Sequence, residues 1–273
     1  MKEDKKIPEE VKERTNILFI NLKGGSAKTT CSSICASYLE DVTLVEVDKI
    51  NRSDSRINGQ KFYKSIQADF NNETSETFFD FEVELKLPGI KIIDVGAVKL
   101  EIFHKAMSIS NLYDSIDLII IPAMDGNDDF VVAMNYLESI KDFFPSHKIM
   151  FSFNRFNEYE YSHAEEQFDS FFLNSETINN QYGIDLSDEK NYFVLKDSKA
   201  VKRARKLGVT LRSLAEEDLK EVSSKQEKAT TKDEIKDFAR QKSAIIAAQV
   251  FEQNYVKPMI SKILEKISNI KNK

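Results

Sequence analysis

The residues with the most evident chemistry lie between positions 23 and 30, where the sequence reads KGGSAKTT. They follow a short apolar run and precede a segment with helical periodicity. In that order, glycines let the backbone curl so that successive N–H groups point at an anion, and the first turn of the helix adds its positive end. Lys28 would then reach the β- and γ-phosphates of a nucleotide, and the Thr29 hydroxyl would help to hold Mg²⁺.

This loop departs from the ordinary phosphate-binding pattern G-x-x-x-x-G-K-[ST], because Leu22 and Ala27 occupy the two glycine positions. What remains is K-G-G-x-x-K-T-T, with an additional lysine, Lys23, at its start. A Gly-Gly turn with incidental lysines would explain the glycines, but not two lysines and two threonines in phosphate-binding order. We therefore predict a phosphate site made by consecutive residues: Lys23, Gly24, Gly25, Ser26, Ala27, Lys28, Thr29 and Thr30.

Acidic side chains end two other apolar runs. Asp48 follows the run VTLVEV at 42–47, and Asp94 is the last acid of the run IKIID. A carboxylate just past the tip of a buried strand lies where open α/β sheets bind ligands. Position alone would also allow Asp48 to cap a turn or a helix, but the phosphate loop upstream favours the ligand-binding interpretation.

Cysteine and histidine do not indicate a metal site. Cys31 and Cys35 are the only cysteines, and His104, His147 and His163 are scattered without the spacing of metal ligands. A zinc site needs about four ligands, and a disulfide framework needs more cysteines. We expect the two cysteines to be small apolar residues on the buried face of a helix.

Short β-rich runs alternate with segments of helical period along most of the chain. The runs lie at 16–21, 42–47, 90–95, 117–121, 148–154 and 191–195. They are nearly continuous in Val, Ile, Leu and Phe rather than alternating, as is typical of strands buried on both faces. The predicted fold class is α/β, a mainly parallel twisted sheet with helices on both faces, with a C-terminal helical extension. The stretch 60–86 gives no clear assignment beyond a loop at 71–75.

A basic segment interrupts an otherwise acidic chain. Between 196 and 212 there are seven basic residues and one acid, which gives +6, so the remainder of the chain, whose total is −6, carries −12. Such a local reversal of sign is typical of proteins that bind nucleic-acid phosphates. A solvated helix face and an acidic protein partner are the alternatives. The candidate DNA-binding residues are Lys199, Lys202, Arg203, Arg205, Lys206 and Arg212.

The tail from 256 to 270 has apolar residues at a spacing of three or four, with lysines between them. This pattern predicts an amphipathic helix with a basic polar face. We expect the helix to pack on the domain's own core or on a partner subunit, whereas a membrane surface is the alternative.

Length and composition indicate one large folded domain. The chain has 273 residues, 41% of them apolar, with 39 basic and 45 acidic side chains. We expect a charged arm at 1–15 and a single domain over 16–273, with C-terminal helices from about 216. The apolar runs are too short to span a bilayer, and the charged first residues do not resemble a secretory signal, so the expected location is cytoplasmic.

The loop at 23–30 resembles the deviant Walker A motif of the ParA/MinD group of P-loop ATPases. The resemblance implies that Lys23 reaches across a dimer to the partner's nucleotide, and that Lys28 and Thr29 act as the P-loop lysine and the magnesium-side threonine. Val42–Val47 followed by Asp48 is similar to the family's second motif, which implies that Asp48 orients the attacking water, and Glu46 stands where that motif has its first aspartate. Asp94 matches the Walker B aspartate that holds Mg²⁺ through water. Lys23, Lys28 and Asp48 are therefore the expected catalytic residues.

Three further segments resemble the family more loosely. Asn154 is similar to the strand-end asparagine that contacts adenine, although it could equally be a turn residue. Ile119–Pro122 resembles the strand that ends in proline, and the region that begins with Lys196 and Asp197 resembles the loop and helix that close over the base.

The resemblance is strongest to ParA-type DNA partition ATPases. It implies a protein that hydrolyses ATP with Mg²⁺, forms a homodimer with ATP, binds DNA without sequence preference on the nucleoid and responds to a centromere-binding, ParB-like adaptor. A MinD-like ATPase on a membrane and a small-molecule ligase on the same fold are the alternatives, and membrane binding is not expected. A nitrogenase-reductase type would need cluster-binding cysteines after the loop, and a tyrosine kinase of this group would need a C-terminal tyrosine cluster; the sequence has neither.

Overall fold

A computed structural model describes residues 13–47, 61–68 and 75–272, and every structural statement below refers to these residues. Asp48, part of the predicted site, lies outside them.

The centre of the molecule is a seven-stranded sheet in the order β3-β2-β4-β1-β5-β6-β7, in which all neighbouring strands are parallel. The strands are β1 (Arg14–Phe19), β2 (Val42–Val47), β3 (Tyr63–Gln67), β4 (Gly89–Val95), β5 (Leu118–Ala123), β6 (Ile149–Phe156) and β7 (Tyr192–Lys196). The α/β fold class is confirmed, and each of the six predicted runs forms a strand. Because β1 lies between β4 and β5, the loop that follows it leaves from the middle of the sheet.

Strand β3 was not predicted, and the reason is its position at an edge. Only Tyr63 of this strand is buried, and the other residues, up to Gln67, are half-buried or exposed. The run therefore lacks the continuous apolar character by which the other strands were predicted. The helix that follows, α3 (Ser75–Lys86), was also not predicted. Its buried residues Phe78, Phe81 and Leu85 pack into the core on one side of the sheet.

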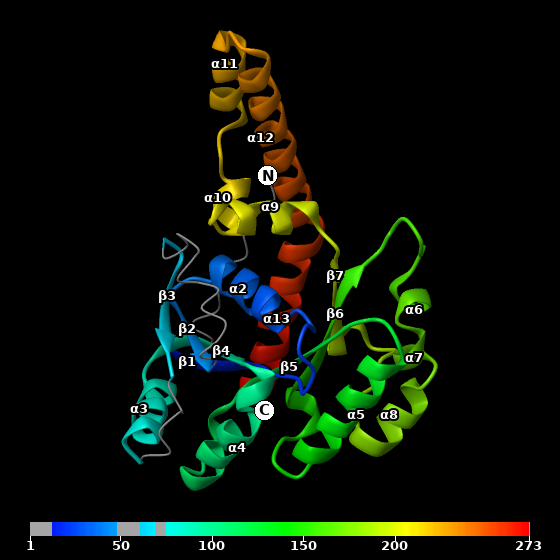
Figure 1. The fold of residues 1–273 in the computed structure, drawn as a ribbon. Coiled ribbons are helices and arrows are strands. Elements are labelled where there is room, and N and C mark those ends of the chain that lie inside the picture. Colours follow the sequence, from blue (N-terminus) through cyan, green and yellow to red (C-terminus); the bar gives the residue numbers. More distant parts are fainter. Residues whose placement is uncertain (1–12, 48–60, 69–74, 273) are drawn as a thin grey trace.

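Helices cover both faces of the sheet (Figure 1). One face packs against α3, α4 (Leu100–Ile109), α5 (Asn127–Ile140), α6 (Ala164–Gln167), α7 (Asp169–Phe172) and α8 (Ser175–Tyr182). The other face packs against α2 (Lys28–Tyr38), α9 (Lys199–Leu207), α10 (Leu211–Ala215) and the C-terminal helices. Consecutive β1 residues face opposite cores: Leu18 contacts the first and Phe19 the second.

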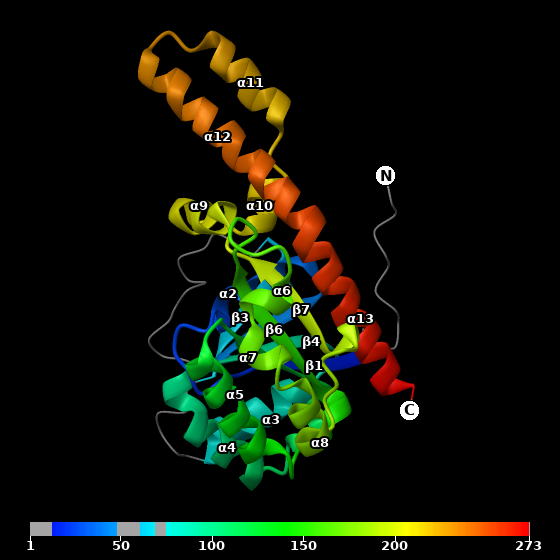
Figure 2. The same ribbon diagram turned by 90° about the vertical axis from the view of Figure 1, so that its right-hand side faces the viewer.

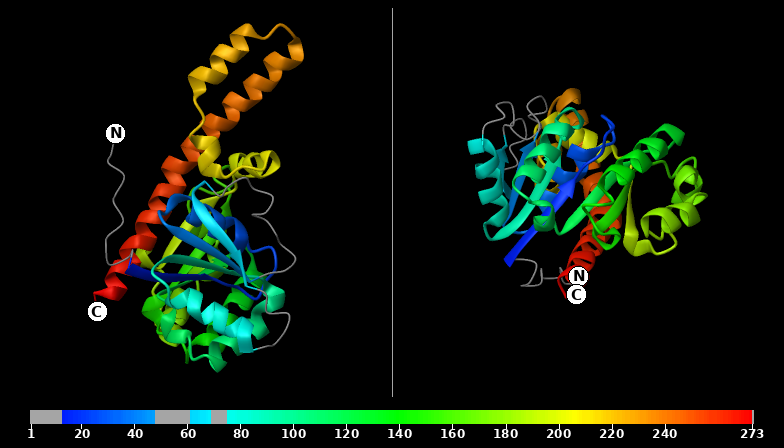
Figure 3. Two further views of the ribbon diagram at one scale, coloured as in Figure 1. Left: turned by 90° about the vertical axis from the view of Figure 1, so that its left-hand side faces the viewer. Right: turned by 90° about the horizontal axis from the view of Figure 1, so that it is seen from below.

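An antiparallel helical hairpin stands out from this body (Figures 2 and 3). It consists of α11 (Leu219–Lys228) and α12 (Lys232–Phe251), and α12 begins with a capping box in which Thr231 and Glu234 satisfy each other's backbone N–H groups. A single π-helical turn, Glu252–Val256, joins α12 to α13 (Lys257–Lys271). The three segments form one long rod whose lower part lies against the sheet and whose upper part projects from it.

Helix α13 packs on the core, as the amphipathic pattern predicts. Met259, Ile263, Leu264 and Ile267 are buried in the cluster that also contains Phe193 of β7. On the polar side of α13, Lys262 pairs with Glu189 at 3.3 Å. The apolar stripe is therefore occupied by the protein itself and is not available to a lipid surface. Among the residues that the structure describes, no helix is long and apolar enough to cross a bilayer.

Candidate functional site

The predicted phosphate loop connects β1 to α2 at the carboxyl edge of the sheet, where open parallel sheets bind ligands. Asn21 anchors its first residues: the side-chain amide donates to the Pro122 carbonyl of β5 at 2.5 Å, and its Oδ1 accepts from the Lys23 N–H at 2.9 Å. Asn21 was not predicted from the sequence, because a strand-end asparagine is common in turns. Its two bonds fix the direction in which the loop leaves β1.

Two residues in the loop have left-handed backbone angles. Gly25 has φ +82°, which glycine adopts without strain, and a Cβ added at Gly24 or Gly25 would meet no atom within 4 Å. The space over these two residues is thus open to an incoming group. Ala27 has φ +67° directly before the first turn of α2, so the position where the ordinary motif has glycine also has the conformation that glycine prefers.

The Lys28 amine lies inside the curl of the loop. Its Nζ donates to the Lys23 carbonyl at 2.8 Å and approaches Ser26 Oγ at 3.5 Å, and the residue is only 7% exposed. A buried ammonium needs acceptors, and the loop's own carbonyl provides one. The geometry places a cation inside the loop, directly before the first turn of α2.

Lys23 is held by a residue that sequence reasoning missed. Its ammonium forms an ion pair with Asp129 in the first turn of α5, and this hydrogen bond raises the pKa of Lys23. Asp129 is 3% exposed, and its Oδ1 also accepts from the Met124 N–H at 3.3 Å. In the sequence, Asp128 and Asp129 look like acids that favour any helix N-terminus, so nothing singled out one of them.

Asp94 lies near the carboxyl end of β4, next to the strand that leads into the loop. It is 5% exposed and is aligned with Phe19 of β1 on one side and with Glu46 of β2 on the other. Glu46 is also buried, and its carboxylate accepts from Ser65 Oγ at 3.4 Å. The two predicted carboxylate strands are therefore adjacent.

The predicted magnesium ligands suit that ion only together with a nucleotide. Thr29 and Asp94 offer one hydroxyl and one carboxylate, which are the hard oxygen donors that Mg²⁺ takes. Within the described part of the chain, no group of three or more His, Cys, Asp or Glu residues could hold a metal ion by itself. Mg²⁺ usually keeps several waters and binds substrate phosphates, so two protein ligands fit a nucleotide-bound ion.

Asn154 is buried beneath the loop. It is 2% exposed, and its amide donates to the Ser26 carbonyl at 3.3 Å and to the Ser152 carbonyl at 2.9 Å. Its Oδ1 accepts from Ser152 Oγ at 3.0 Å, and Ser152 in turn contacts Cys31 of α2. In this structure the side chain supports the phosphate loop from β6. The predicted contact with adenine remains a prediction.

A β-bulge follows directly after Asn154. The register between β6 and β7 shifts between Asn154 and Phe156, and Arg155 has φ +61°. As a result Phe153 and Phe156 both face the same core, while Arg155 is exposed at the edge of the sheet. Bulges often occur next to active sites, but the residue pattern of β6 gave no sign of this one.

The next predicted nucleotide-binding residues lie at the end of β7. Lys196 forms an ion pair with Glu158, and its ammonium lies 5.4 Å from the centre of the Tyr159 ring. Asp197 pairs with Lys202 at 2.7 Å. Both residues are at the same edge of the sheet as the phosphate loop, although their present contacts are with other side chains.

Helix α9 carries most of the basic segment. Ser198 caps its start by accepting from the Ala200 N–H at 3.1 Å, and Gly208 ends it with φ +69°. Ala200 and Ala204 are buried against the body. The opposite side of the helix carries four cationic side chains, which helical spacing places on one broad face: Lys199, Lys202, Arg203 and Lys206.

The two remaining cations of the segment point elsewhere. Arg205 Nη2 donates to Thr30 Oγ1 in the first turn of α2 at 2.7 Å. Arg212 donates to the Ser37 carbonyl at 3.0 Å, pairs with Glu216 at 2.9 Å and lies over the Phe62 ring at 4.4 Å. The structure thus divides the basic residues into an outward face on α9 and two arginines that bind α2.

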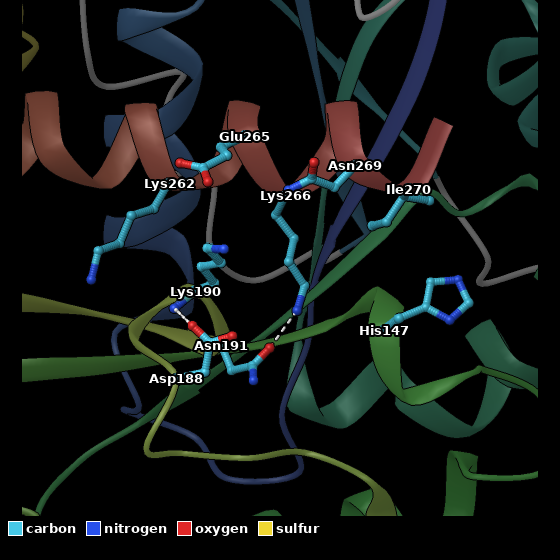
Figure 4. Close-up of a pocket in the computed structure, with 9 residues that line it drawn as sticks. All are labelled: His147, Asp188, Lys190, Asn191, Lys262, Glu265, Lys266, Asn269 and Ile270. Carbon is cyan, nitrogen blue, oxygen red and sulfur yellow. Dashed lines mark hydrogen bonds between the residues drawn. The ribbon is translucent and has the colours of Figure 1, made fainter. Parts of the chain in front are cut away.

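A separate cavity of about 150 Å³ lies at the other end of the sheet (Figure 4). His147 and Asn191, which line it, precede β6 and β7, so the cavity is at the amino edge and away from the phosphate loop. Lys266 of α13 donates to Asn191 Oδ1 at 2.6 Å across it. This contact helps to fasten α13 to the body.

No protein-family model matches the sequence, and no curated protein matches it. Solved structures do resemble its fold. A putative plasmid partition protein from Borrelia burgdorferi bound to AMPPNP is 13% identical, with 86% of this chain and 99% of that chain covered and a TM-score of 0.50. The structure of pnob8 ParA is 12% identical, with 94% and 99% covered and a TM-score of 0.54.

The MinD cell division protein of Aquifex aeolicus is also similar, at 14% identity, with 72% of this chain and 88% of that chain covered and a TM-score of 0.46. The resemblance of the sequence to the ParA/MinD group is thus confirmed in the fold, which this chain shares with the Borrelia protein and with pnob8 ParA.

Proposed function

We propose that this chain is a ParA-like ATPase that partitions DNA. The observation that carries the proposal is the loop Lys23–Thr30 in the middle of a parallel sheet, with Lys28 inside the curl and a second lysine at its rim. The AMPPNP-bound relative of the same fold supports nucleotide as the ligand of such a loop. The nucleotide is ATP with Mg²⁺, and the products are ADP and phosphate.

Nucleotide binding would change the hydrogen-bond acceptors of the Lys28 ammonium. The Lys28 ammonium leaves the Lys23 carbonyl for phosphate oxygens, while the N–H groups of the loop and the start of α2 take the remaining negative charge. Thr29 would help to hold the magnesium ion, and Asp94 would hold it through water. Asp48, the residue after Val47 in the sequence, would orient the attacking water.

Dimerisation would require Lys23 to change partner. In the single chain its ammonium is bonded to Asp129, and in an ATP-bound homodimer it would contact the phosphates of the other subunit. Triphosphate carries more negative charge than one carboxylate, so ATP favours that exchange. Binding of the γ-phosphate thereby becomes the signal for assembly, and hydrolysis reverses it.

DNA would bind to the outward face of α9. Lys199, Lys202, Arg203 and Lys206 form this face, and a rigid helix keeps their spacing fixed. Phosphate contacts of this kind are independent of sequence, which suits a protein that moves over the nucleoid. A ParB-like adaptor on the centromere would stimulate the ATPase and so release the DNA. Contact with a membrane is disfavoured, because the apolar stripe of α13 is buried.

A DNA gel-shift series with no nucleotide, with ADP and with ATP tests the proposal. We expect retarded DNA only with ATP and Mg²⁺, on fragments of any sequence. The Lys28→Ala variant is the matched control, because it lacks the central cation of the loop and should retard no DNA under any condition. Retardation that does not depend on nucleotide, or calorimetry that detects no ATP binding by the unaltered chain, would reject it.

A further inference from the structure

We infer that Arg205 binds the phosphates of the nucleotide and does not belong to the DNA-binding face of α9. The inference rests on the proposed function, because it assigns an additional residue to the same nucleotide site. It starts from one contact: the Arg205 Nη2 donates to Thr30 Oγ1 at 2.7 Å. Thr30 is the last residue of the predicted phosphate loop and lies in the first turn of α2.

The position of Arg205 on its helix separates it from the other cations. Ala200 and Ala204 define the buried side of α9, and at about 100° per residue the four cations of the outward face fall within one arc of about 100°. Arg205 lies about 60° outside that arc, and its contact with Thr30 places it on the side that faces α2. Its side chain therefore extends toward the phosphate loop, and DNA lying on the outward face would not meet it.

The contact leaves hydrogen-bond donors available on both residues. The Thr30 hydroxyl accepts from Arg205, so its own proton remains to be donated. The guanidinium has five N–H groups, of which Thr30 takes one. Together with the N–H groups in the first turn of α2, these donors form an anion-binding arrangement beside Lys28.

The cleft at this contact is too small for the rest of a nucleotide. It has a volume of about 30 Å³, and its lining joins the polar residues Thr30, Ser33, Arg205 and Thr210 to apolar ones such as Ile34 and Val201. A ribose or a base would not fit, whereas a phosphate oxygen or a water would. We therefore assign to Arg205 a contact with phosphate at the rim of the site.

Calorimetric titration of Arg205→Ala with Mg·ADP and with Mg·ATP tests the inference. Loss of a charge-assisted contact is expected to weaken both nucleotides by about tenfold. Arg205→Lys, which keeps the charge but loses the fork, should recover part of the affinity. Arg240→Ala is the control: it removes an arginine of α12 that pairs with Asp237, far along the hairpin, and should bind both nucleotides like the unaltered chain.

A double-mutant cycle with Thr30→Val separates a shared contact from two independent ones. If Arg205 and Thr30 hold the same phosphate, the double variant should lose less affinity than the sum of the two single losses. Thermal unfolding of each variant accompanies the titrations, because a role limited to joining α9 to α2 would lower the melting temperature and leave nucleotide affinity intact; that result would overturn the inference.

The opposite pattern would return Arg205 to the DNA surface. In that case Arg205→Ala would bind ADP and ATP like Arg240→Ala, while the salt dependence of DNA binding would fall by the amount expected for one phosphate contact. Failure of the unaltered chain to bind any nucleotide would instead reject the proposed function itself, so the two failures are distinguishable.

Discussion

The Lys23 ammonium is bonded to Asp129 of its own chain, and that pairing sets a cost on dimerisation. The Lys23 side chain is 38% exposed, whereas that of Asp129 is almost fully buried. In the isolated chain the pair keeps the lysine at the rim of its own phosphate loop. A partner's triphosphate must therefore compete with a carboxylate that is already in place.

Replacement of Asp129 by asparagine should ease that competition. The amide oxygen can still accept from the Met124 N–H, so the start of α5 should remain intact. Partly exposed ion pairs are weak, and we expect ATP-dependent dimerisation to become tighter by about two- to fivefold. Sedimentation at several protein concentrations measures this change. Weaker dimerisation would mean that Asp129 is needed to orient Lys23 in the dimer.

Ala27 allows a second prediction about the same loop. Its φ of +67° costs an alanine about 1 kcal/mol, which a glycine does not incur. Ala27→Gly should therefore leave the free energy of unfolding unchanged or raise it by up to about 1 kcal/mol, after the greater freedom of glycine in the unfolded chain is subtracted. Urea denaturation measures the difference.

Gly25→Ala is the matched variant, because it introduces the strain that Ala27→Gly removes. With φ at +82° it should lower the free energy of unfolding by about 1–2 kcal/mol. Equal effects of the two substitutions would show that the loop changes conformation when its residues change.

The sequence identified the residues of the loop but not the residues that hold them. Lys28 and Thr29 were evident because a phosphate site requires those residue types in consecutive positions. Asp129 and Arg205 are distant in sequence from the loop, and each resembles an ordinary surface residue of a helix. Only the fold brings them to the site: Asp129 at the start of α5 contacts Lys23, and Arg205 of α9 contacts Thr30 of α2.

Among the helices, α13 allows the sharpest test. Ile263 is fully buried in the core beneath β7, so Ile263→Ala should lower the free energy of unfolding by about 2–5 kcal/mol. Ile246 on α12 is the matched residue: it is 48% exposed, and Ile246→Ala should change stability by no more than about 0.5 kcal/mol. Denaturation curves of the two variants compare a buried and an exposed isoleucine of the same rod. A small effect at Ile263 would indicate that α13 leaves the core.

Strands whose consecutive residues are all buried were predicted correctly from the sequence. Strands β4, β5 and β6 are apolar on both faces, and their sequences show this directly. Strand β3 has only one side against the sheet and one partner strand, so its residues carry a weaker pattern. The periodicity of the tail likewise predicted α13, because its apolar residues recur at the helical spacing.

At the scale of the whole molecule, the outward face of α9 sets the salt dependence of DNA binding. Each neutralised phosphate releases condensed counterions, so removal of one contact lowers the slope of log K against log[salt] by roughly 0.9 in magnitude. The triple variant Lys199→Ala, Arg203→Ala and Lys206→Ala should therefore lose roughly 2.7 of that slope for each subunit that contacts the DNA, together with most of its affinity. Fluorescence anisotropy with ATP present measures both quantities.

The hairpin provides the control for this experiment. Alanine substitution of Lys225, Lys232 and Lys236 removes the same charge from α11 and α12. These residues lie along the projecting arm, so we expect the slope to stay near that of the unaltered chain. Equal losses in both triple variants would show that the net charge of the protein, and not the α9 face, attracts the DNA.

The alternation of predicted strands and helices indicated the α/β architecture, but it did not indicate the shape of the whole molecule. Helical segments after position 216 were expected from composition, whereas their arrangement as a hairpin that leaves the body was not. That arrangement depends on the cap at Thr231, which fixes where α12 begins, and on the burial of α13, which fixes the direction of the rod.

The π-helical turn at Glu252–Val256 lies between the buried helix α13 and the hairpin helix α12. Below it α13 is fastened in the core, and above it α12 extends for twenty residues, or about 30 Å at 1.5 Å per residue. The lower turns of α12 are held by the buried residues Ile245, Ala248 and Phe251, and only its upper turns project. A tilt of only about 10° of the whole helix at the π-helical turn would carry its far end through about 5 Å. Small displacements of β7 or α9 would therefore produce larger displacements at the far end of the hairpin. The distance between a label on that end and a label on the body would record them.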